Sequence, residues 1–249
     1  MPTLILLRHG QSEWNQQNLF TGWYNCDLTN IGIKEALQAG KLLDEAGLIP
    51  DVTFSSLQKR AIKTAELVNQ SLNREIPIHK NWRLNERHYG DLTGLNKSDA
   101  KVKFGEEKIQ EWRRGYHTPP PPISPENNFN PNTDDAYANV PKESIPLTEC
   151  LADVVDRLIP YWNSDISKDL RSGKKVLVAA HGNSLRALCK HLDKIDDKEI
   201  VKLNIPTGIP FIYDLDEELN PLIEKPVLER ALDPKTAQTQ AESVKKQTQ

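Results

Sequence analysis

The chain has 249 residues, of which 37% are hydrophobic and 27% charged, as in an ordinary globular protein. Its 32 basic and 35 acidic residues give a formal net charge of −3, which offers no general attraction to nucleic acid or anionic lipid. No stretch approaches the roughly 18 apolar residues of a membrane span, and the N-terminus lacks the pattern of a signal peptide. We therefore expect neither a nucleic-acid partner nor a membrane partner, and any anion site must be local.

The cysteines are few, odd in number and far apart: Cys26, Cys150 and Cys189. A disulfide framework or a cysteine metal site would need paired or clustered cysteines at characteristic spacings. The pattern favours a reducing compartment, and we predict a cytoplasmic protein.

Short apolar runs and helical periodicity predict an α/β fold. The expected strands are Leu4–Leu7, Val52–Ser55, Val176–Ala180 and Phe211–Tyr213. Helices are expected from the Thr29 cap toward Gly47, from Leu57 to Val68, and after the turn His181-Gly182-Asn183-Ser184. Strand–helix units of this kind predict one domain with a mostly parallel central sheet flanked by helices.

Two segments differ from this pattern in composition. Eight of the 17 prolines lie between Tyr116 and Pro146, which predicts an extended surface insertion over residues 116–146 that frames a cleft. A polyproline spacer or docking segment is the alternative. Residues 231–249 are polar, and we expect a mobile C-terminal tail after a domain over residues 1–230, with a lid over an active site as the second interpretation.

Basic and imidazole side chains follow the expected strands at their C-terminal ends. Arg8, His9 and Gly10 end the first strand, Arg60 lies one helical turn beyond the second, and His181 ends the third. Ligands of open α/β sheets bind beyond these strand ends, so neighbouring strands would bring two histidines and two arginines into one pocket.

These residue types suit phosphoryl transfer. A neutral imidazole accepts a phosphoryl group when its other nitrogen is held, and arginine holds two phosphate oxygens in a planar fork. A metal site is the weaker interpretation, because His9 and His181 lack an evident third ligand and the arginines would repel a cation.

Glu86 lies between two arginines in Trp82-Arg83-Leu84-Asn85-Glu86-Arg87-His88-Tyr89-Gly90. A surface salt bridge is one interpretation of such a glutamate. A general acid/base near a transferred phosphate is the other, and the surrounding Asn, His, Tyr and Gly favour it. Lys97, Arg113 and Arg114 are further candidates for gripping a carboxylate or phosphate.

Five motifs together resemble the histidine phosphatase superfamily and, within it, the 2,3-bisphosphoglycerate-dependent phosphoglycerate mutases. They are Leu7-Arg8-His9-Gly10-Gln11-Ser12-Glu13-Trp14-Asn15, Phe20-Thr21-Gly22-Trp23, the Arg60 helix, Asn85-Glu86-Arg87-His88-Tyr89-Gly90 and Ala180-His181-Gly182-Asn183-Ser184. Trp112-Arg113-Arg114 and Asn204-Ile205-Pro206-Thr207-Gly208 extend the match, which covers residues 3 to about 228.

The resemblance implies a phosphohistidine at His9, a proton donor and acceptor at Glu86, and interconversion of 3- and 2-phosphoglycerate. It implies 2,3-bisphosphoglycerate as the phosphoryl primer, no metal, and a homo-oligomer with a dimer favoured. The catalytic set would be His9, Glu86, His181, Arg8 and Arg60. The residues that bind substrate would be Arg8, Asn15, Thr21, Gly22, Arg60, Glu86, Arg87, His88, Tyr89, Lys97, Arg113, Arg114, Gly182 and Asn183.

Two other functions stay open on the residues alone. In a phosphatase of the same superfamily, water would attack phospho-His9, whereas a retired binding module would keep the fold without the chemistry. The insertion and the context of Glu86 favour the mutase, as does Gly22, because related bisphosphoglycerate synthases carry serine there. Gln11 is a departure, since the family usually has glutamate at this position.

Overall fold

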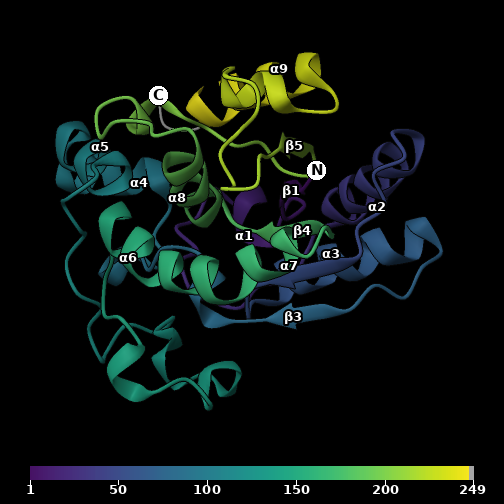
Figure 1. The fold of residues 1–249 in the computed structure, drawn as a ribbon. Helices are drawn as coiled ribbons and strands as arrows, with labels where there is room; N and C mark the ends of the chain where they lie inside the picture. Colours follow the sequence, from purple (N-terminus) through teal and green to yellow (C-terminus); the bar gives the residue numbers. More distant parts are fainter. Residues whose placement is uncertain (247–249) are drawn as a thin grey trace.

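A five-stranded sheet forms the centre of the molecule (Figure 1). The computed structural model describes residues 1–246. The strand order is β3-β2-β4-β1-β5, and β5 alone runs antiparallel to its neighbour. The strands are β1 Thr3–Arg8, β2 Val52–Ser55, β3 Ile78–Lys80, β4 Lys175–Ala180 and β5 Pro210–Asp214. The predicted single α/β domain with a mostly parallel sheet is confirmed.

The four strands expected from the sequence all form, with ends that differ by at most one residue. The fifth, β3, was not expected, because its three residues include the exposed His79 and Lys80 and so make no apolar run. An edge strand of this length is buried too little to leave a hydrophobic signal.

Helices cover both faces of the sheet, and the alternation of strand side chains decides which helix meets which residue. Ile5 and Leu7 of β1 pack with α2 and α3, whereas Leu4 and Leu6 pack with α6 and α8. The helices are α1 Glu13–Gln16, α2 Asn30–Glu45, α3 Lys59–Leu72, α4 Lys97–Phe104, α5 Glu106–Arg114, α6 Leu151–Tyr161, α7 Ser167–Arg171, α8 Gly182–Leu192 and α9 Pro234–Lys246.

The ends of α2 follow from local chemistry. Thr29 Oγ1 accepts a hydrogen bond from the Gly32 N–H at 3.1 Å, as predicted for the cap. Gly47, which follows the last turn, has a φ of +66°, a left-handed conformation that glycine adopts without steric cost. Helix α3 begins two residues later than predicted and runs four residues further.

The Pro-rich insertion forms three short 3₁₀ turns within residues 116–146, at Pro131–Thr133, Asp135–Tyr137 and Lys142–Ser144. In Figure 1 the segment projects from the lower end of the molecule, far from α9. It is anchored through Tyr137, whose hydroxyl donates to the Trp23 carbonyl at 2.5 Å, and through Asn132, whose Oδ1 lies 3.3 Å from His88 Nε2.

Helix α9 occupies Pro234–Lys246 within the tail that is expected to be mobile, and this mobility stays a prediction. Asp233 caps the helix by accepting from the Thr236 N–H at 3.0 Å, and Ala237 and Ala241 are buried one turn apart. Two alanines in a run of Gln, Lys and Thr give too weak a pattern to predict this packing. Residues 247–249 of the expected tail lie outside the described residues. No helix within residues 1–246 is long and apolar enough to cross a membrane.

Candidate active site

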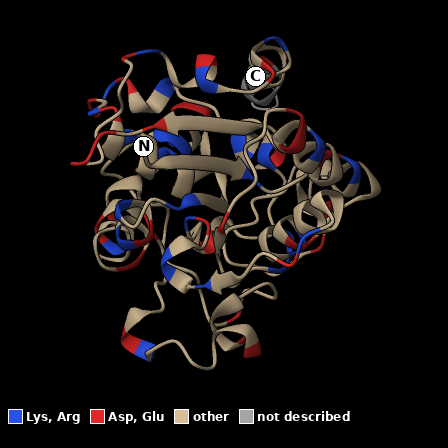
Figure 2. Ribbon diagram, turned by 45° about the vertical axis from the view of Figure 1, so that its right-hand side comes forward, with Lys and Arg blue, Asp and Glu red and all other residues tan. Residues whose placement is uncertain are grey.

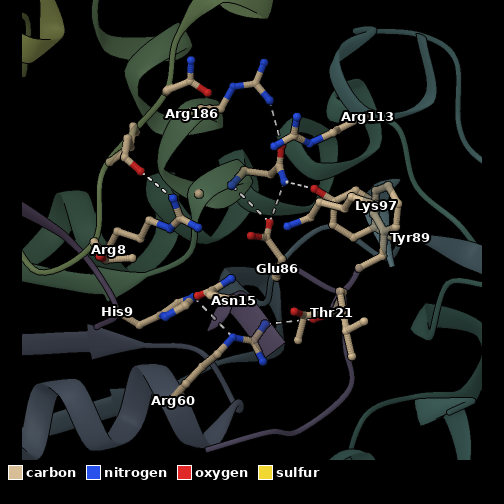
Figure 3. Close-up of a pocket in the computed structure, with 18 of the residues that line it drawn as sticks. Arg8, His9, Asn15, Thr21, Arg60, Glu86, Tyr89, Lys97, Arg113 and Arg186 are labelled. Carbon is tan, nitrogen blue, oxygen red and sulfur yellow. Dashed lines mark hydrogen bonds between the residues drawn. The ribbon is translucent and has the colours of Figure 1, made fainter. Parts of the chain in front are cut away.

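A polar pocket of about 150 Å³ lies beyond the C-terminal ends of β1 and β4 (Figure 3). The connection from β1 leads toward α2 on one face, and that from β4 enters α8 on the other, so the chain diverges here. This is the topological position at which open α/β sheets bind ligands. Its walls are Arg8, His9, Gln11, Asn15, Leu19, Phe20, Thr21, Gly22, Arg60, Glu86, Tyr89, Lys97, Arg113, Arg114, Gly182, Asn183, Arg186, Leu203, Asn204, Ile205 and Thr207.

His9 is a buried, neutral imidazole with one nitrogen held. Its Nδ1 lies 2.7 Å from the Gly10 carbonyl oxygen, which can only accept, so Nδ1 carries the proton. Nε2 therefore holds the lone pair, and Arg60 Nε donates to it at 3.3 Å. Burial, with the nearby Arg60 and Arg8 charges, lowers the pKa of His9 well below its usual value. The imidazole is thus poised as a nucleophile through Nε2.

His181 lies behind His9, with ring centroids 5.0 Å apart. Ser56 Oγ is 2.7 Å from its Nε2, whereas its Nδ1 is buried and has no hydrogen-bond partner among the described residues. Burial and the Arg60 charge lower the pKa of His181 well below its usual value. A buried nitrogen without a hydrogen-bond partner costs free energy.

Arg60 is placed by the first turn of α3 and by carbonyls of the preceding loop. It is only 1% exposed, and its Nη2 and Nη1 donate to the Gly22 and Tyr24 carbonyls at 2.9 and 3.0 Å. Gly22 has a φ of +52°, and a Cβ there would lie 3.0 Å from the Tyr89 backbone nitrogen. The turn at Gly22 therefore both aims the guanidinium and allows the close approach of Tyr89.

Glu86 presents one carboxylate oxygen to the pocket while the other is fully engaged. Oε1 accepts from the Asn183 N–H at 3.1 Å, from Asn183 Nδ2 at 2.9 Å and from the Arg87 N–H at 2.8 Å. Oε2 accepts no hydrogen bond from the described residues and lies 3.7 Å from where a Cβ on Gly182 would be. Figure 3 shows Glu86 in the centre of the labelled side chains, between His9 and Lys97.

The pocket carries a strong excess of positive charge. It is lined by six basic side chains against the single carboxylate of Glu86: Arg8, Arg60, Lys97, Arg113, Arg114 and Arg186. Elsewhere, acidic and basic residues are interspersed along the ribbon (Figure 2), so the net charge of −3 hides a local anion site. Such a cluster, walled by low-dielectric protein, attracts polyanionic ligands.

Burial and mutual repulsion weaken proton binding within this cluster. The pKa of Lys97 falls to about 7, first because of burial and then because of Arg113 and Arg8. Burial with the Arg114 charge lowers the pKa of Arg113 to about 9. The pKa of Arg186 also falls to about 9 through burial and the Arg114 charge. An anionic ligand would relieve this repulsion and is therefore favoured.

Three of these arginines also hold one wall of the pocket. Arg8 Nη1 donates to the Ile205 carbonyl at 2.7 Å, and Arg186 Nη2 donates to the Ile200 carbonyl at 2.7 Å. Arg114 Nη2 donates to Asn204 Oδ1 at 2.5 Å. The segment 200–205 is thereby tied to the anion site.

No group of three or more His, Cys, Asp or Glu residues that could hold a metal ion occurs within the described part of the chain. The donors that line the pocket are cationic, which suits an anion and not a metal.

Residues 4–218 match the family model of the histidine phosphatase superfamily (branch 1). The chain belongs to this superfamily.

Two curated relatives show which enzymes of the superfamily this chain is similar to in sequence. A protein of Streptomyces avermitilis is 55% identical over 245 residues, covering 98% of this chain and 96% of its own. One of Rhodococcus jostii is 58% identical over 221 residues, covering 88% and 87%. Both are named 2,3-bisphosphoglycerate-dependent phosphoglycerate mutase. Among solved structures, Bacillus stearothermophilus YhfR has a TM-score of 0.68 at 24% identity, with 89% of this chain and 96% of that chain covered, a likeness of fold.

Of the residues predicted from the resemblance to the superfamily, thirteen line the pocket: Arg8, His9, Asn15, Thr21, Gly22, Arg60, Glu86, Tyr89, Lys97, Arg113, Arg114, Gly182 and Asn183. His181 contacts His9 from behind without forming the wall. Arg87 also lies behind the wall, where its guanidinium stacks on the Tyr89 ring at 4.7 Å and donates to the Arg113 carbonyl.

His88 is a correction to the prediction of a substrate-binding residue, because its ring faces away from the pocket. Its Nδ1 accepts from the Gly90 N–H at 3.0 Å, and its Nε2 faces Asn132. The next residue in the chain, Tyr89, points into the pocket instead. The insertion is a second correction: no residue of 116–146 lines the pocket, and the segment supports its wall from outside through Tyr137 and Asn132.

Gln11, Arg186 and the segment 203–207 line the pocket without being among the predicted site residues. Arg186 could have been predicted from the sequence, because it lies three residues after Asn183 on α8 and therefore on the same face of the helix. Its Nη1 donates to Asn183 Oδ1 at 2.8 Å. Segment 203–207 reaches the pocket only through tertiary folding; residues 204–207 belong to a motif of the family match to which no role in the site was assigned.

Proposed function

We propose that this chain interconverts 3-phosphoglycerate and 2-phosphoglycerate through a phosphohistidine at His9. The main support for this proposal is the neutral His9 imidazole. Its Nε2 faces the pocket that Glu86 also lines with Oε2. The mutase name is shared by relatives that are 52–58% identical to this chain.

The phosphoryl group would be held by His9 and its cationic neighbours. Arg60 already donates to His9 Nε2, and Arg8 Nε is buried and unpartnered within the described residues, facing the same space. These two guanidinium groups would donate to the equatorial oxygens of a phosphoryl group in flight, while His181 packs against His9. Asn15 lines the same end of the pocket.

In the first half of the cycle, the C2 hydroxyl of 3-phosphoglycerate attacks phospho-His9. Glu86 takes the hydroxyl proton as the new O–P bond forms and the Nε2–P bond breaks. His9 keeps its Nδ1 proton and returns to the neutral imidazole, and the product in the pocket is 2,3-bisphosphoglycerate. A carboxylate within reach of the hydroxyl contributes general base catalysis of about 10²–10⁴-fold.

In the second half, the bisphosphate turns so that its C3 phosphate faces His9. Nε2 attacks this phosphorus, the C3 O–P bond breaks, and Glu86 returns its proton to the leaving oxygen. The products are 2-phosphoglycerate and phospho-His9, so the enzyme ends as it began. Free 2,3-bisphosphoglycerate would prime an unphosphorylated chain by this same half reaction.

The remainder of the pocket would grip the other end of the substrate. Lys97 of α4 and Arg113 of α5 lie across the pocket from His9 (Figure 3). Together with Arg114, which also lines the pocket, they would offer charge-assisted hydrogen bonds to a carboxylate or the second phosphate. Thr21, Gly22, Tyr89, Gly182 and Asn183 shape the space between the two ends. Arg87 would act indirectly, by holding Tyr89 and Arg113.

The decisive experiment combines labelling and turnover. Incubation with 2,3-bisphosphoglycerate radiolabelled in its phosphates is expected to leave acid-labile phosphate on His9, and 3-phosphoglycerate should be converted in an enolase-coupled assay. His9→Ala should lose both signals. Absence of both signals in the wild-type chain would refute the proposal, and label that passes only to water would identify a phosphatase.

A homodimer and a cytoplasmic location stay predictions from the sequence. Light scattering coupled to size-exclusion chromatography tests the first, with a mass of twice 28.3 kDa expected.

A further inference from the structure

A buried ion pair outside the pocket joins Glu149 to Arg157 of α6. Arg157 Nε donates to Glu149 Oε1 at 2.6 Å, and Nη2 donates to Oε2 at 3.1 Å. The side chain of Arg157 is 7% exposed and that of Glu149 is 3% exposed, and neither lines the active-site pocket. Removing two charges from water costs several kcal/mol per ion, so the pair is retained at a cost to stability unless its geometry is excellent.

The remaining hydrogen bonds of this pair converge on the segment that carries Glu86. Arg157 Nη1 donates to the Arg83 carbonyl at 2.6 Å, and Nη2 donates to the Asn85 and Glu86 carbonyls at 2.9 and 3.1 Å. One guanidinium thereby fixes three carbonyls of a segment without regular secondary structure beyond the short 3₁₀ turn Trp82–Leu84.

Glu149 fixes the same segment from its other side. Its Oε2 accepts from the His88 N–H at 2.7 Å. The backbone on both sides of Glu86 is therefore tied to one ion pair, whose acid precedes α6 and whose base lies within it.

The other supports of Glu86 belong to different elements. Gln58 Oε1 accepts the Glu86 N–H at 2.8 Å, and Asn183 of α8 holds the carboxylate. Since α6 packs against α8 in the same core, the ion pair sets how far the Glu86 segment stands from the helix that aims its carboxylate. A displacement of about 1 Å at a reacting group can lower turnover by two orders of magnitude.

We propose that Glu149 and Arg157 are positioning residues that hold Glu86 where it exchanges a proton with the substrate oxygen. The inference rests on the role proposed for Glu86 and extends it to two side chains that touch no substrate. Arg157 suits this task because its planar fork reaches four oxygen-bearing groups at once, which a lysine ammonium does not.

The test compares Arg157→Lys with Arg230→Lys, a matched control. Arg230 Nη2 likewise pairs with a carboxylate, Asp193 Oδ1 at 2.7 Å, and donates to the Ile223 carbonyl at 3.0 Å, yet it makes no contact with residues 83–88. Both changes keep the charge. We expect Arg157→Lys to lower kcat about tenfold or more with KM within about twofold, and Arg230→Lys to leave both within about twofold.

A second readout separates misplaced Glu86 from general damage. Labelling of His9 by 2,3-bisphosphoglycerate needs a proton for the leaving alkoxide, whereas p-nitrophenyl phosphate releases a phenolate that needs none. Arg157→Lys should slow the first labelling by the factor seen in kcat and leave the second within about twofold of wild type. Equal loss with both donors would overturn the proposal, as would a normal kcat or a loss carried by KM.

Glu149→Gln keeps the size of the side chain and serves if Arg157→Lys does not fold; the same donor dependence with a smaller loss is expected. Equal loss with both donors, or no loss at all, would overturn the proposal through this variant too. A wild-type chain without mutase turnover would refute the proposed function itself. A fully active wild type with an unimpaired Arg157→Lys variant would refute only the positioning role.

Discussion

Asn183 holds the Glu86 carboxylate by two hydrogen bonds to the same oxygen, one from its backbone N–H at 3.1 Å and one from Nδ2 at 2.9 Å. The first comes from the N-terminal turn of α8, where backbone N–H groups lack helical partners. The second oxygen of Glu86 is left to face the pocket. The fold thus separates the two oxygens of one carboxylate into an anchored oxygen and a reactive one.

Replacing Glu86 by Gln is expected to lower mutase turnover by about 10²–10⁴-fold, because an amide accepts hydrogen bonds but takes no proton at neutral pH. His9 should still be labelled by p-nitrophenyl phosphate, since its nucleophilic nitrogen is untouched. Enolase-coupled turnover and acid-labile phosphate measure the two effects. Wild-type turnover in Glu86→Gln would remove the proton-transfer role assigned to this residue.

Lys97 should make substrate capture depend on pH. Its pKa lies near 7, so the free enzyme loses the ammonium charge as the pH rises through neutrality and binds the anionic substrate less well. We expect kcat/KM to fall above pH 7 in the wild type. In Lys97→Gln it should be about tenfold lower at pH 6.5, with this alkaline limb removed. Lys103→Gln on the same helix is the control, because Lys103 is exposed. If kcat/KM of Lys97→Gln still falls above pH 7, the titrating group is not Lys97.

His88 should contribute to acid unfolding. Burial lowers its pKa from 6.5 to about 4, so between these pH values the unfolded chain binds the proton and the folded chain does not. The contribution of neutral His88 to the free energy of unfolding is therefore complete above pH 6.5. It decreases by about 3 kcal/mol in total as the pH falls from 6.5 toward 4.

The measurement is the free energy of unfolding in urea at several pH values. His88→Gln should flatten the dependence between pH 6.5 and 4, whatever its stability at neutral pH. His79→Gln, on the exposed edge strand, should keep the wild-type slope. Equal slopes in all three proteins would contradict the buried, neutral state of His88.

Gly22→Ala should impair turnover beyond its cost in stability. A Cβ at this left-handed position lies 3.0 Å from the Tyr89 nitrogen, and the Gly22 carbonyl accepts from Arg60, so relief of the close contact is expected to disturb the aim of the guanidinium. Gly47→Ala is a matched control, because Gly47 also has a positive φ but a Cβ there meets nothing within 4 Å. Both should lose about 1–3 kcal/mol of folding free energy. Only Gly22→Ala should also lose about tenfold in kcat, and equal kcat values would show that the contact with Tyr89 has no catalytic consequence.

The sequence predicted those parts of the site that follow directly from a strand or its turn. His9 and His181 could be predicted from the sequence because each follows an apolar run. Glu86 could be predicted because arginines and polar residues surround it. His88 was misassigned since sequence proximity to Glu86 and Tyr89 does not say which way a side chain in an irregular segment points.

Tertiary contacts account for the rest. Glu149 and Arg157 show no special pattern, because a charged pair of this kind becomes visible only when the chain brings α6 beneath residues 83–88. The same holds for α9, whose buried alanines have too little apolar surface to stand out until the core beneath them is known. Local periodicity predicts elements well, whereas the partners of an element depend on the whole fold.

The parallel register of β1 and β4 sets the spacing of His9 and His181. Arg8 of β1 pairs with Ala180 of β4, so the two imidazoles are the next residues along adjacent parallel strands. Their separation is a property of backbone pairing, with about 3.3 Å of travel per residue along each strand. A single-residue deletion in either strand would slide one histidine past the other or turn it to the opposite face, with every pocket residue still present in the sequence. Relatives that vary widely in their helices and loops should therefore keep the lengths of these two strands, and an insertion there marks a protein in which this chemistry has been abandoned.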